Sequence, residues 1–220
     1  MIWNALKLSL LVVSIATVLI AVVGTALGYL LAKRGFRGKD LLDAVLTLPM
    51  VLPPTVTGYY LILLLGRHGV LGGPLFELTG WSVAFTWVAA VTASAVVALP
   101  LMIKSARAAI ESVDAEYEIA SYIMGKREFE TFFRITLPIA ARGILAGVIL
   151  SFARAFGEFG ATLMLAGNIP GKTQTMPLAI YEAVVSGEDA KAKWLALILT
   201  GISVTVIYLT NRLSRPKNRH

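Results

Sequence analysis

The chain has 220 residues, of which 57% are hydrophobic and only 15% are charged, and its formal net charge is +7. One soluble core of this length cannot bury so much apolar surface, so the lipid bilayer is the expected solvent. The sequence holds no cysteine and only two histidines, which excludes disulfides, thiol nucleophiles and a usual zinc site. Since no basic patch is interleaved with aromatic residues, the positive charge does not indicate a nucleic-acid partner.

Five apolar stretches are each long enough to cross the bilayer as a helix, which needs about 20 residues. They lie near 8–32, 41–65, 83–103, 139–165 and 194–211. The sequence therefore predicts an all-α, polytopic membrane helical bundle that forms a single transmembrane domain over residues 1–220. Acidic residues interrupt a sixth stretch, 174–190, which we interpret as an outer loop with a short interfacial helix.

The distribution of basic residues predicts the direction of the spans, because lysine and arginine favour the cytoplasmic side of short loops. With the N-terminus outside, fourteen basic residues lie on the inner side, five lie on the outer side, and Arg154 lies within a span. The opposite orientation would invert this ratio. We therefore predict a multi-pass protein of the cytoplasmic membrane with its N-terminus outside and its C-terminus inside.

Small residues and prolines mark particular spans. Gly24 with Gly28, and Gly143 with Gly147, stand four residues apart, a spacing that lets helix backbones approach closely. The second span contains a cluster of helix-breaking residues followed by a threonine: Pro49, Pro53, Pro54 and Thr55. Each proline removes a backbone donor and bends a helix, and in lipid the freed carbonyls need protein or water as partners. The cluster indicates either a broken helix that lines a pathway or a simple kink.

The largest inner segment, 104–138, carries the most specific pattern. A helix is predicted to begin near Ser112 or Asp114 and to end at Gly125. Residues 126–134 predict a second, amphipathic helix with three phenylalanines on one side, and Pro138 should start the next span. Amphipathicity alone would also suit a helix that lies on the membrane surface.

The same segment resembles the signature loop of permease subunits of binding-protein-dependent ABC importers, in which Glu-Ala-Ala, a glycine and Ile-x-Leu-Pro recur at this spacing. Seven residues carry the resemblance: Glu118, Ala120, Ser121, Gly125, Ile135, Leu137 and Pro138. Glu118 is displaced by one position, and Ser121 replaces an alanine. The resemblance implies a type I ABC importer transmembrane domain whose coupling helix, Glu118 to Gly125, contacts a cytoplasmic ATPase subunit.

Several partners follow from this resemblance. It implies two copies of the ATPase subunit, a second copy of this permease and an extracytoplasmic binding protein. ATP and Mg would be bound by the ATPase subunit, and no cofactor by this chain. The chain itself is then a transport subunit and not an enzyme.

A second pattern occupies residues 151–181. Arg154 and Glu158 stand four residues apart on one helical face within a span, where each charge can neutralise the other. The pair is either part of a pathway or gate, or a structural bridge between helices. With the sequence Gly-Glu-Phe-Gly at 157–160 and Asn-Ile-Pro-Gly at 168–171, the stretch resembles molybdate permeases. That resemblance implies molybdate as the solute, with tungstate, sulfate and thiosulfate as alternatives.

Two other classes of protein fit less well. A stand-alone secondary transporter often shows an internal repeat, and no repeat is visible in the sequence. An intramembrane hydrolase needs a nucleophile with a base, or a metal cluster, and the spans offer neither. The sequence therefore favours a transport subunit that works with a separate motor.

Overall fold

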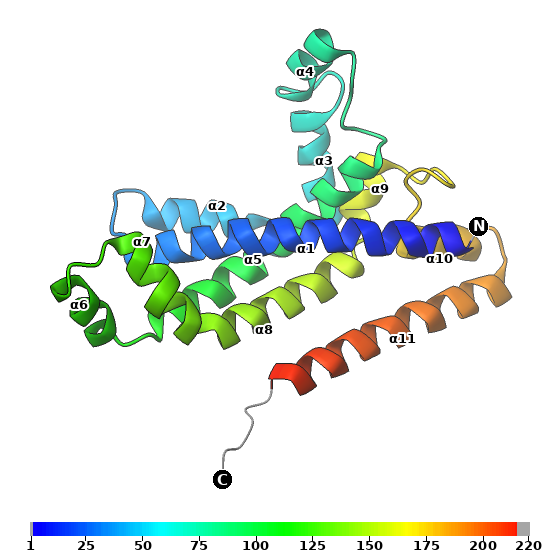
Figure 1. The fold of residues 1–220 in the computed structure, drawn as a ribbon. Coiled ribbons are helices and arrows are strands. Elements are labelled where there is room, and N and C mark those ends of the chain that lie inside the picture. Colours follow the sequence, from blue (N-terminus) through cyan, green and yellow to red (C-terminus); the bar gives the residue numbers. More distant parts are fainter. Residues whose placement is uncertain (1, 215–220) are drawn as a thin grey trace.

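A computed structural model of the chain describes residues 2–214, which form a bundle of helices without strands (Figure 1). The elements are α1 (Ile2–Lys33), α2 (Lys39–Val51), α3 (Pro54–Leu65), α4 (Gly72–Thr79), α5 (Trp87–Glu111), α6 (Ala115–Ile123), α7 (Glu128–Thr131), the π-helical turn η1 (Phe132–Thr136), α8 (Leu137–Phe156), α9 (Gly160–Ala166), α10 (Met176–Val185) and α11 (Asp189–Ser214). The inner basic residues Arg215, Lys217 and Arg219 lie outside the described residues.

The structure gives four to five candidate spans where the sequence predicts five. Between residues 2 and 214, four helical stretches are long and apolar enough to cross a membrane: Ile2–Lys33, Trp87–Glu111, Glu128–Phe156 and Asp189–Tyr208. α2 and α3 together give a fifth span when the bent pair is counted as one. The all-α membrane bundle predicted from composition is therefore the architecture observed.

Two predicted spans are broken. The chain bends by 118° between α2 and α3, because Leu52 and Pro53 between them have extended ψ values of 145° and 136°. The stretch predicted as one helix over 139–165 ends at Phe156 and starts again at Gly160. Beside this break, the Glu158 carboxylate accepts the N–H of Ala161 in the first turn of α9 at 2.8 Å.

The third span is displaced along the chain from its predicted bounds. It begins at Trp87, because the Thr86 hydroxyl accepts the N–H of Ala89 and caps the helix there. It continues to Glu111, so that Lys104 and Arg107 project from the inner end of a helix and not from a loop. The inner loop is correspondingly shorter than the predicted 104–138.

α5 runs through the middle of the bundle between α1 and α8 (Figure 1). Both predicted glycine pairs face it, and a Cβ added to any of the four would lie 2.5 to 2.8 Å from a side-chain atom of α5. Gly24 faces Met102, Gly28 faces Ala106, Gly143 faces Ala109, and Gly147 faces Ser105. The three helices are therefore in close backbone contact, as the glycine spacing predicts.

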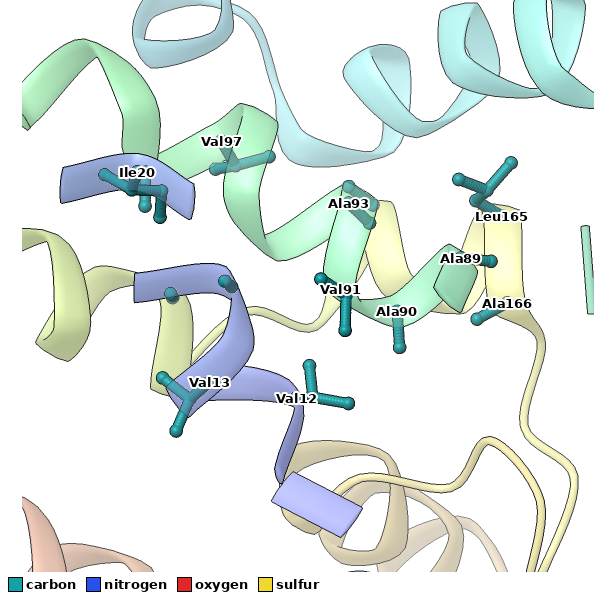
Figure 2. Close-up of a cluster of buried hydrophobic side chains, with 14 of the residues drawn as sticks. Val12, Val13, Ile20, Ala89, Ala90, Val91, Ala93, Val97, Leu165 and Ala166 are labelled. Carbon is teal, nitrogen blue, oxygen red and sulfur yellow. The ribbon is translucent and has the colours of Figure 1, made fainter. Parts of the chain in front are cut away.

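The main hydrophobic core extends along the same contact from the outer end of α5 to Met102 and Ala106. Figure 2 shows valine and isoleucine side chains of α1 beside small residues of α5 and the end of α9. The labelled members are Val12, Val13, Ile20, Ala89, Ala90, Val91, Ala93, Val97, Leu165 and Ala166. Alanines on α5 let the larger side chains of α1 approach its backbone.

The stretch 174–190 does contain a short helix, α10. It packs into the bundle against α1 and α11, and its Met176 N–H is donated to the buried Ser9 hydroxyl of α1 at 2.7 Å. α11 then runs obliquely away from the bundle (Figure 1). Its first turns are packed through Ala192 and Leu195, whereas most of its remaining described side chains are partly or fully exposed.

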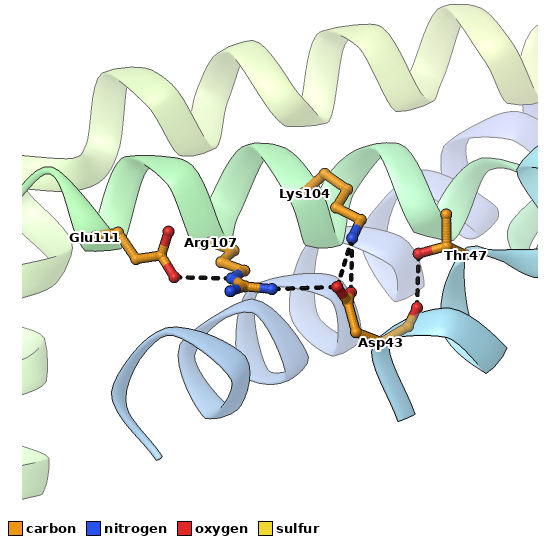
Figure 3. A network of polar contacts seen from close by, with 5 residues as sticks. All are labelled: Asp43, Thr47, Lys104, Arg107 and Glu111. Atoms are coloured by element: carbon orange, nitrogen blue, oxygen red, sulfur yellow. Dashed lines mark hydrogen bonds and ion pairs between the residues drawn. The ribbon is translucent and has the colours of Figure 1, made fainter. Parts of the chain in front are cut away.

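The inner half of α2 is attached to α5 by charges (Figure 3). Lys104 Nζ lies 2.7 and 2.8 Å from the two carboxylate oxygens of Asp43, and Arg107 Nη1 lies 3.2 Å from Asp43 Oδ2. Arg107 Nε also donates to Glu111 Oε1 at 2.8 Å. No residue of α2 is buried, so this network is its principal anchor to α5 in the described chain.

Candidate functional site

The signature loop folds into what we call the coupling segment, residues 115–136, which comprises α6, α7 and η1. α6 begins where the Asp114 carboxylate accepts the N–H of Glu116 at 3.0 Å, as an N-terminal cap does. It is followed by Gly125, whose φ of +78° lies in the left-handed region that favours glycine. Both predicted helix boundaries are confirmed.

The second predicted helix, 126–134, is part of a longer one. It begins at Glu128 and continues through η1 into α8. In η1 the N–H of Leu137 is donated to the Phe132 carbonyl, five residues back. Pro138 follows directly and has no N–H to donate. The span therefore does not start at Pro138, which instead stands where the helix changes from π to α hydrogen bonding.

Glu118 points into its own chain. Its side chain is buried, with the residue only 8% exposed. Oε2 accepts from Lys33 Nζ at 2.8 Å, and Oε1 accepts from the Thr136 hydroxyl at 2.6 Å. The acidic residue of the signature thus joins α6 to the inner end of α1 and to η1. Its contact with an ATPase subunit stays a prediction.

Ser121, which departs from the alanine of the signature, has a specific partner. Its hydroxyl lies 2.9 Å from the Thr131 hydroxyl of α7, and both residues are buried. A buried hydroxyl without a partner is costly, so the serine satisfies Thr131 where an alanine could not. This hydrogen bond fixes α6 against α7.

The opposite face of the coupling segment is apolar and exposed. It comprises Tyr117, Ile119, Tyr122, Ile123, Met124 and Phe129, and we call it the outward face. Ile123 is 81% exposed. Partial burial, with the carboxylates of Glu118 and Glu128 nearby, raises the pKa of the Tyr122 phenol, so the side chain stays neutral. Exposed apolar side chains gathered on a short segment are typical of an interaction surface.

The remaining signature residues lie around these contacts. Ala120 and Gly125 are exposed beside the outward face, whereas Ile135 and Leu137 are half-buried where η1 meets α8. Five of the seven predicted residues therefore lie in the coupling segment, and Leu137 and Pro138 follow it as the first two residues of α8. Sequence reasoning missed the contacts of the coupling segment with α1. Lys33 and Glu118 are 85 residues apart, and the signature pattern that contains Glu118 does not include Lys33.

The two predicted pathway clusters also come together, at the breaks in the spans. α3 packs against α9, and a Cβ on Gly160 would lie 2.9 Å from Pro54 Cβ and 3.3 Å from the Thr55 nitrogen. Pro53 and Thr55 are exposed next to this contact, whereas Pro49 lies half-buried within α2. Of the two interpretations of the prolines, the structure favours the broken helix.

Arg154 and Glu158 form the predicted ion pair, with Arg154 Nη1 2.7 Å from Glu158 Oε2. The Arg154 side chain is 34% exposed and that of Glu158 only 1%. The other oxygen of Glu158 caps α9 through Ala161. Glu158 is therefore both the partner of Arg154 and a hydrogen-bond acceptor for the first turn of α9.

Three buried hydroxyls near the breaks were not predicted. Thr57 on α3, Ser151 on α8 and Thr162 on α9 have side-chain oxygens without a hydrogen-bond partner in the described part of the chain. Buried polar groups are nearly always paired, so these oxygens are candidates for contact with water or a polar solute. Hydroxyl residues in apolar spans were visible in the sequence, but helix geometry was needed to show which are buried.

The outer loop between α9 and α10 is held by side-chain hydrogen bonds. Asn168 Nδ2 donates to Glu182 Oε2 at 3.1 Å, and Gln174 Nε2 donates both to Asn168 Oδ1 at 3.1 Å and to Glu182. The buried Thr173 hydroxyl lies 3.1 Å from the Gly167 carbonyl. The Asn-Ile-Pro-Gly turn therefore has a defined shape at the outer end of the bundle.

A second outer feature is the hairpin of α3 and α4. A hollow of about 650 Å³ lies against it, lined mainly by apolar residues together with Arg67 and His68. The Arg67 guanidinium carbon stands 4.1 Å from the centre of the Phe76 ring. The hollow and the outer loop offer two surfaces for a protein approaching from outside.

Comparison with known proteins places this geometry in a family. Residues 24–219 match the family described as "Binding-protein-dependent transport system inner membrane component". The chain is 41% identical over 214 residues to the molybdenum transport system permease protein ModB of Escherichia coli (strain K12), covering 97% of this chain and 93% of that protein. ModB of Haemophilus influenzae is 42% identical, covering 85% and 82%. The sulfate transport system permease protein CysW of Synechococcus elongatus is 37% identical, covering 94% and 72%.

Solved structures share the fold at low sequence identity. A bacterial ABC transporter for the polysaccharide alginate superimposes with a TM-score of 0.77 at 14% identity, covering 98% of this chain and 79% of that one. The MetNI methionine ABC transporter gives a TM-score of 0.71 at 14% identity, covering 97% and 93%. The type I ABC importer transmembrane fold is thus shown, and the chain belongs to the family of binding-protein-dependent transport system inner membrane components.

Proposed function

We propose that this chain is the membrane-spanning permease subunit of an importer that carries molybdate across the cytoplasmic membrane with energy from ATP hydrolysed by a separate subunit. The observation that carries this proposal is the coupling segment, which is held rigidly from inside the bundle and presents an apolar face outside it. A stand-alone transporter would have no need for such a face.

The outward face is the proposed docking site of the ATPase subunit. Its side chains are apolar and aromatic, the kinds that supply most binding energy at protein interfaces. Glu118 acts from behind this face, since it sets the position of α6 relative to the spans. ATP and Mg then bind to the ATPase subunit, and this chain contributes no catalytic group.

The proposed pathway runs beside the breaks between α2 and α3 and between α8 and α9. Broken helices place backbone polar groups at membrane depth, where they are tolerated if they line a cavity. Pro53 and Thr55 are exposed there, and the buried, unpartnered hydroxyls of Thr57 and Thr162 lie behind them. A second copy of the chain would close the pathway, and an extracytoplasmic binding protein would deliver the anion to the outer loop and the α3–α4 hairpin.

Molybdate is favoured over sulfate by the relatives named for each solute. Two ModB proteins match at 41% and 42% identity, whereas the sulfate permease matches at 37%. Tungstate resembles molybdate closely in charge and shape, so the same pathway would accept it. Sulfate or thiosulfate is the alternative.

The test is anion uptake by cells that lack this chain, with and without its return. Labelled molybdate, tungstate and sulfate are supplied separately, and we expect return of the chain to restore molybdate and tungstate uptake. Restoration of sulfate uptake alone would assign the chain to the alternative solute. Failure to restore any uptake, with the chain present in the membrane, would reject the proposed function.

A further inference from the structure

The inner end of α1 is bound by two carboxylates of the coupling segment. Lys33 Nζ lies 2.8 Å from Glu118 Oε2. One turn before Lys33, the Tyr29 hydroxyl donates to Glu128 Oε1 at 2.9 Å. Directly after α1, Arg34 Nη2 lies 2.5 Å from Glu128 Oε2. α1 is not a chain neighbour of the coupling segment, which lies between α5 and α8 in the sequence, so these contacts are its own attachment.

The two attachments differ in strength. The side chains of Lys33 and Glu118 are 22% and 11% exposed, so water screens this ion pair only weakly. Arg34 and Glu128 are 57% and 42% exposed, and exposed pairs contribute little. Tyr29 adds ring packing against Phe132, with the ring centres 4.7 Å apart. Lys33 with Glu118 is therefore the principal contact, and Tyr29 supports it.

The helices of the coupling segment are joined to one another by buried side-chain hydrogen bonds. The Ser121 and Thr131 hydroxyls join α6 to α7, and Glu118 itself accepts from Thr136 in η1. A displacement of the outward face is therefore transferred to Glu118 without first bending the segment. Because Glu118 also holds Lys33, the same displacement reaches α1.

We propose that α1 is driven directly by the coupling segment through the Lys33–Glu118 ion pair, so that three spans respond to the motor: α5 and α8 through the chain, and α1 through this contact. The inference rests on the proposed function. Lys33 and Glu118 are positioning residues in this scheme, and neither touches the solute. Without the ion pair, closure of the ATPase would act directly on α5 and α8 alone, and the inner end of α1 would be moved only through its packing against α5.

The experiment replaces the ion pair by a removable link. Since the chain has no cysteine, the double variant Lys33→Cys/Glu118→Cys introduces the only thiols of this subunit, and a bifunctional thiol reagent can join them. The assembled complex, with the cysteines of its other subunits replaced, is placed in liposomes. Anion uptake and ATP hydrolysis are measured together, which gives the number of anions imported per ATP.

The unlinked double variant should assemble and hydrolyse ATP while importing at least about fivefold fewer anions per ATP, and linking should restore most of this ratio. Lys33→Arg, which keeps the charge, should stay coupled. The control is Lys39→Cys, a change at a basic residue that starts α2 at the same end of the bundle, which should leave the ratio unchanged.

Full coupling in the unlinked variant would overturn the inference. So would a defect that the link leaves unrepaired, because it would assign the pair a local role within α6. The unmodified complex is measured in the same way. If it imports no anion, the proposed function fails, whereas a defect confined to the variants concerns only the ion pair.

Discussion

Ser121 of α6 and Thr131 of α7 share a hydrogen bond of 2.9 Å in which both hydroxyls are buried. Ser121→Ala would leave the Thr131 hydroxyl without this partner, and an unpaired buried hydroxyl costs about 1–3 kcal/mol. We expect a lower thermal unfolding midpoint of the purified permease. The double variant Ser121→Ala/Thr131→Val removes both hydroxyls and should regain most of the loss. Equal midpoints for the single variant and the unchanged protein would show that the bond contributes nothing.

Ile123, on the outward face, tests the docking of the ATPase. Ile123→Asp places a charge on a side chain that is 81% exposed, so the permease itself should fold normally. At the interface the carboxylate would be desolvated without a partner, which costs several kcal/mol, and we expect at least about a tenfold loss of bound ATPase. Co-purification measures the bound fraction, and Ile123→Met is the matched apolar control. Undiminished co-purification of the Asp variant would place the ATPase elsewhere.

Arg154 and Glu158 give a prediction about paired charges. Arg154→Ala would leave a carboxylate that is 1% exposed without its cation, and since Arg154 is partly exposed we expect a loss of roughly 1–3 kcal/mol in stability. Adding Glu158→Gln removes the charge but keeps an oxygen for the Ala161 N–H that starts α9. The double variant should therefore unfold at a higher temperature, and take up more anion, than Arg154→Ala. The reverse order would argue against pairing.

Gly28 tests the close contact of α1 with α5. A Cβ at this position would stand 3.0 Å from the backbone nitrogen of Arg107 and 3.1 Å from the carbonyl oxygen of Ile103. Both are main-chain atoms, which cannot move aside as the end of a side chain can. Gly28→Ala should cost about 1–3 kcal/mol by forcing the helices apart. The control is Gly201→Ala in α11, where a Cβ meets nothing within 4 Å. Similar unfolding midpoints for the two variants would contradict close packing.

Much of this architecture could be predicted, because membrane helices are specified by local composition. Span length, charge asymmetry and glycine spacing each act within one helix, and the contacts of Gly24 and Gly143 with α5 follow the predicted spacing. The break after Phe156 was missed, because hydropathy continues through it and the hydrogen bond of the Ala161 N–H to Glu158 is visible only in the structure.

In the coupling segment, too, features set by adjacent residues were predictable, whereas contacts between distant residues were not. Its helix boundaries were predictable from Asp114 and Gly125, which act on adjacent backbone. The direction of Glu118 was not, because its partners Lys33 and Thr136 are brought to it by the fold. Ser121 appeared only as a departure from a pattern, since its reason, Thr131, lies ten residues away across a turn.

The glycine contacts on both sides of α5 also constrain how the protein can change shape. With backbones this close, α1, α5 and α8 cannot slide past one another without collisions between main-chain atoms and Cβ atoms. These three helices therefore form one closely packed layer, and the coupling segment is attached to all three at their inner ends. Two helices beside this layer are more lightly packed. α2 is held to α5 mainly by Asp43, and α11 is packed chiefly through its first turns. Opening and closing of a pathway would then move α2 and α11 relative to this layer, while α1, α5 and α8 tilt together.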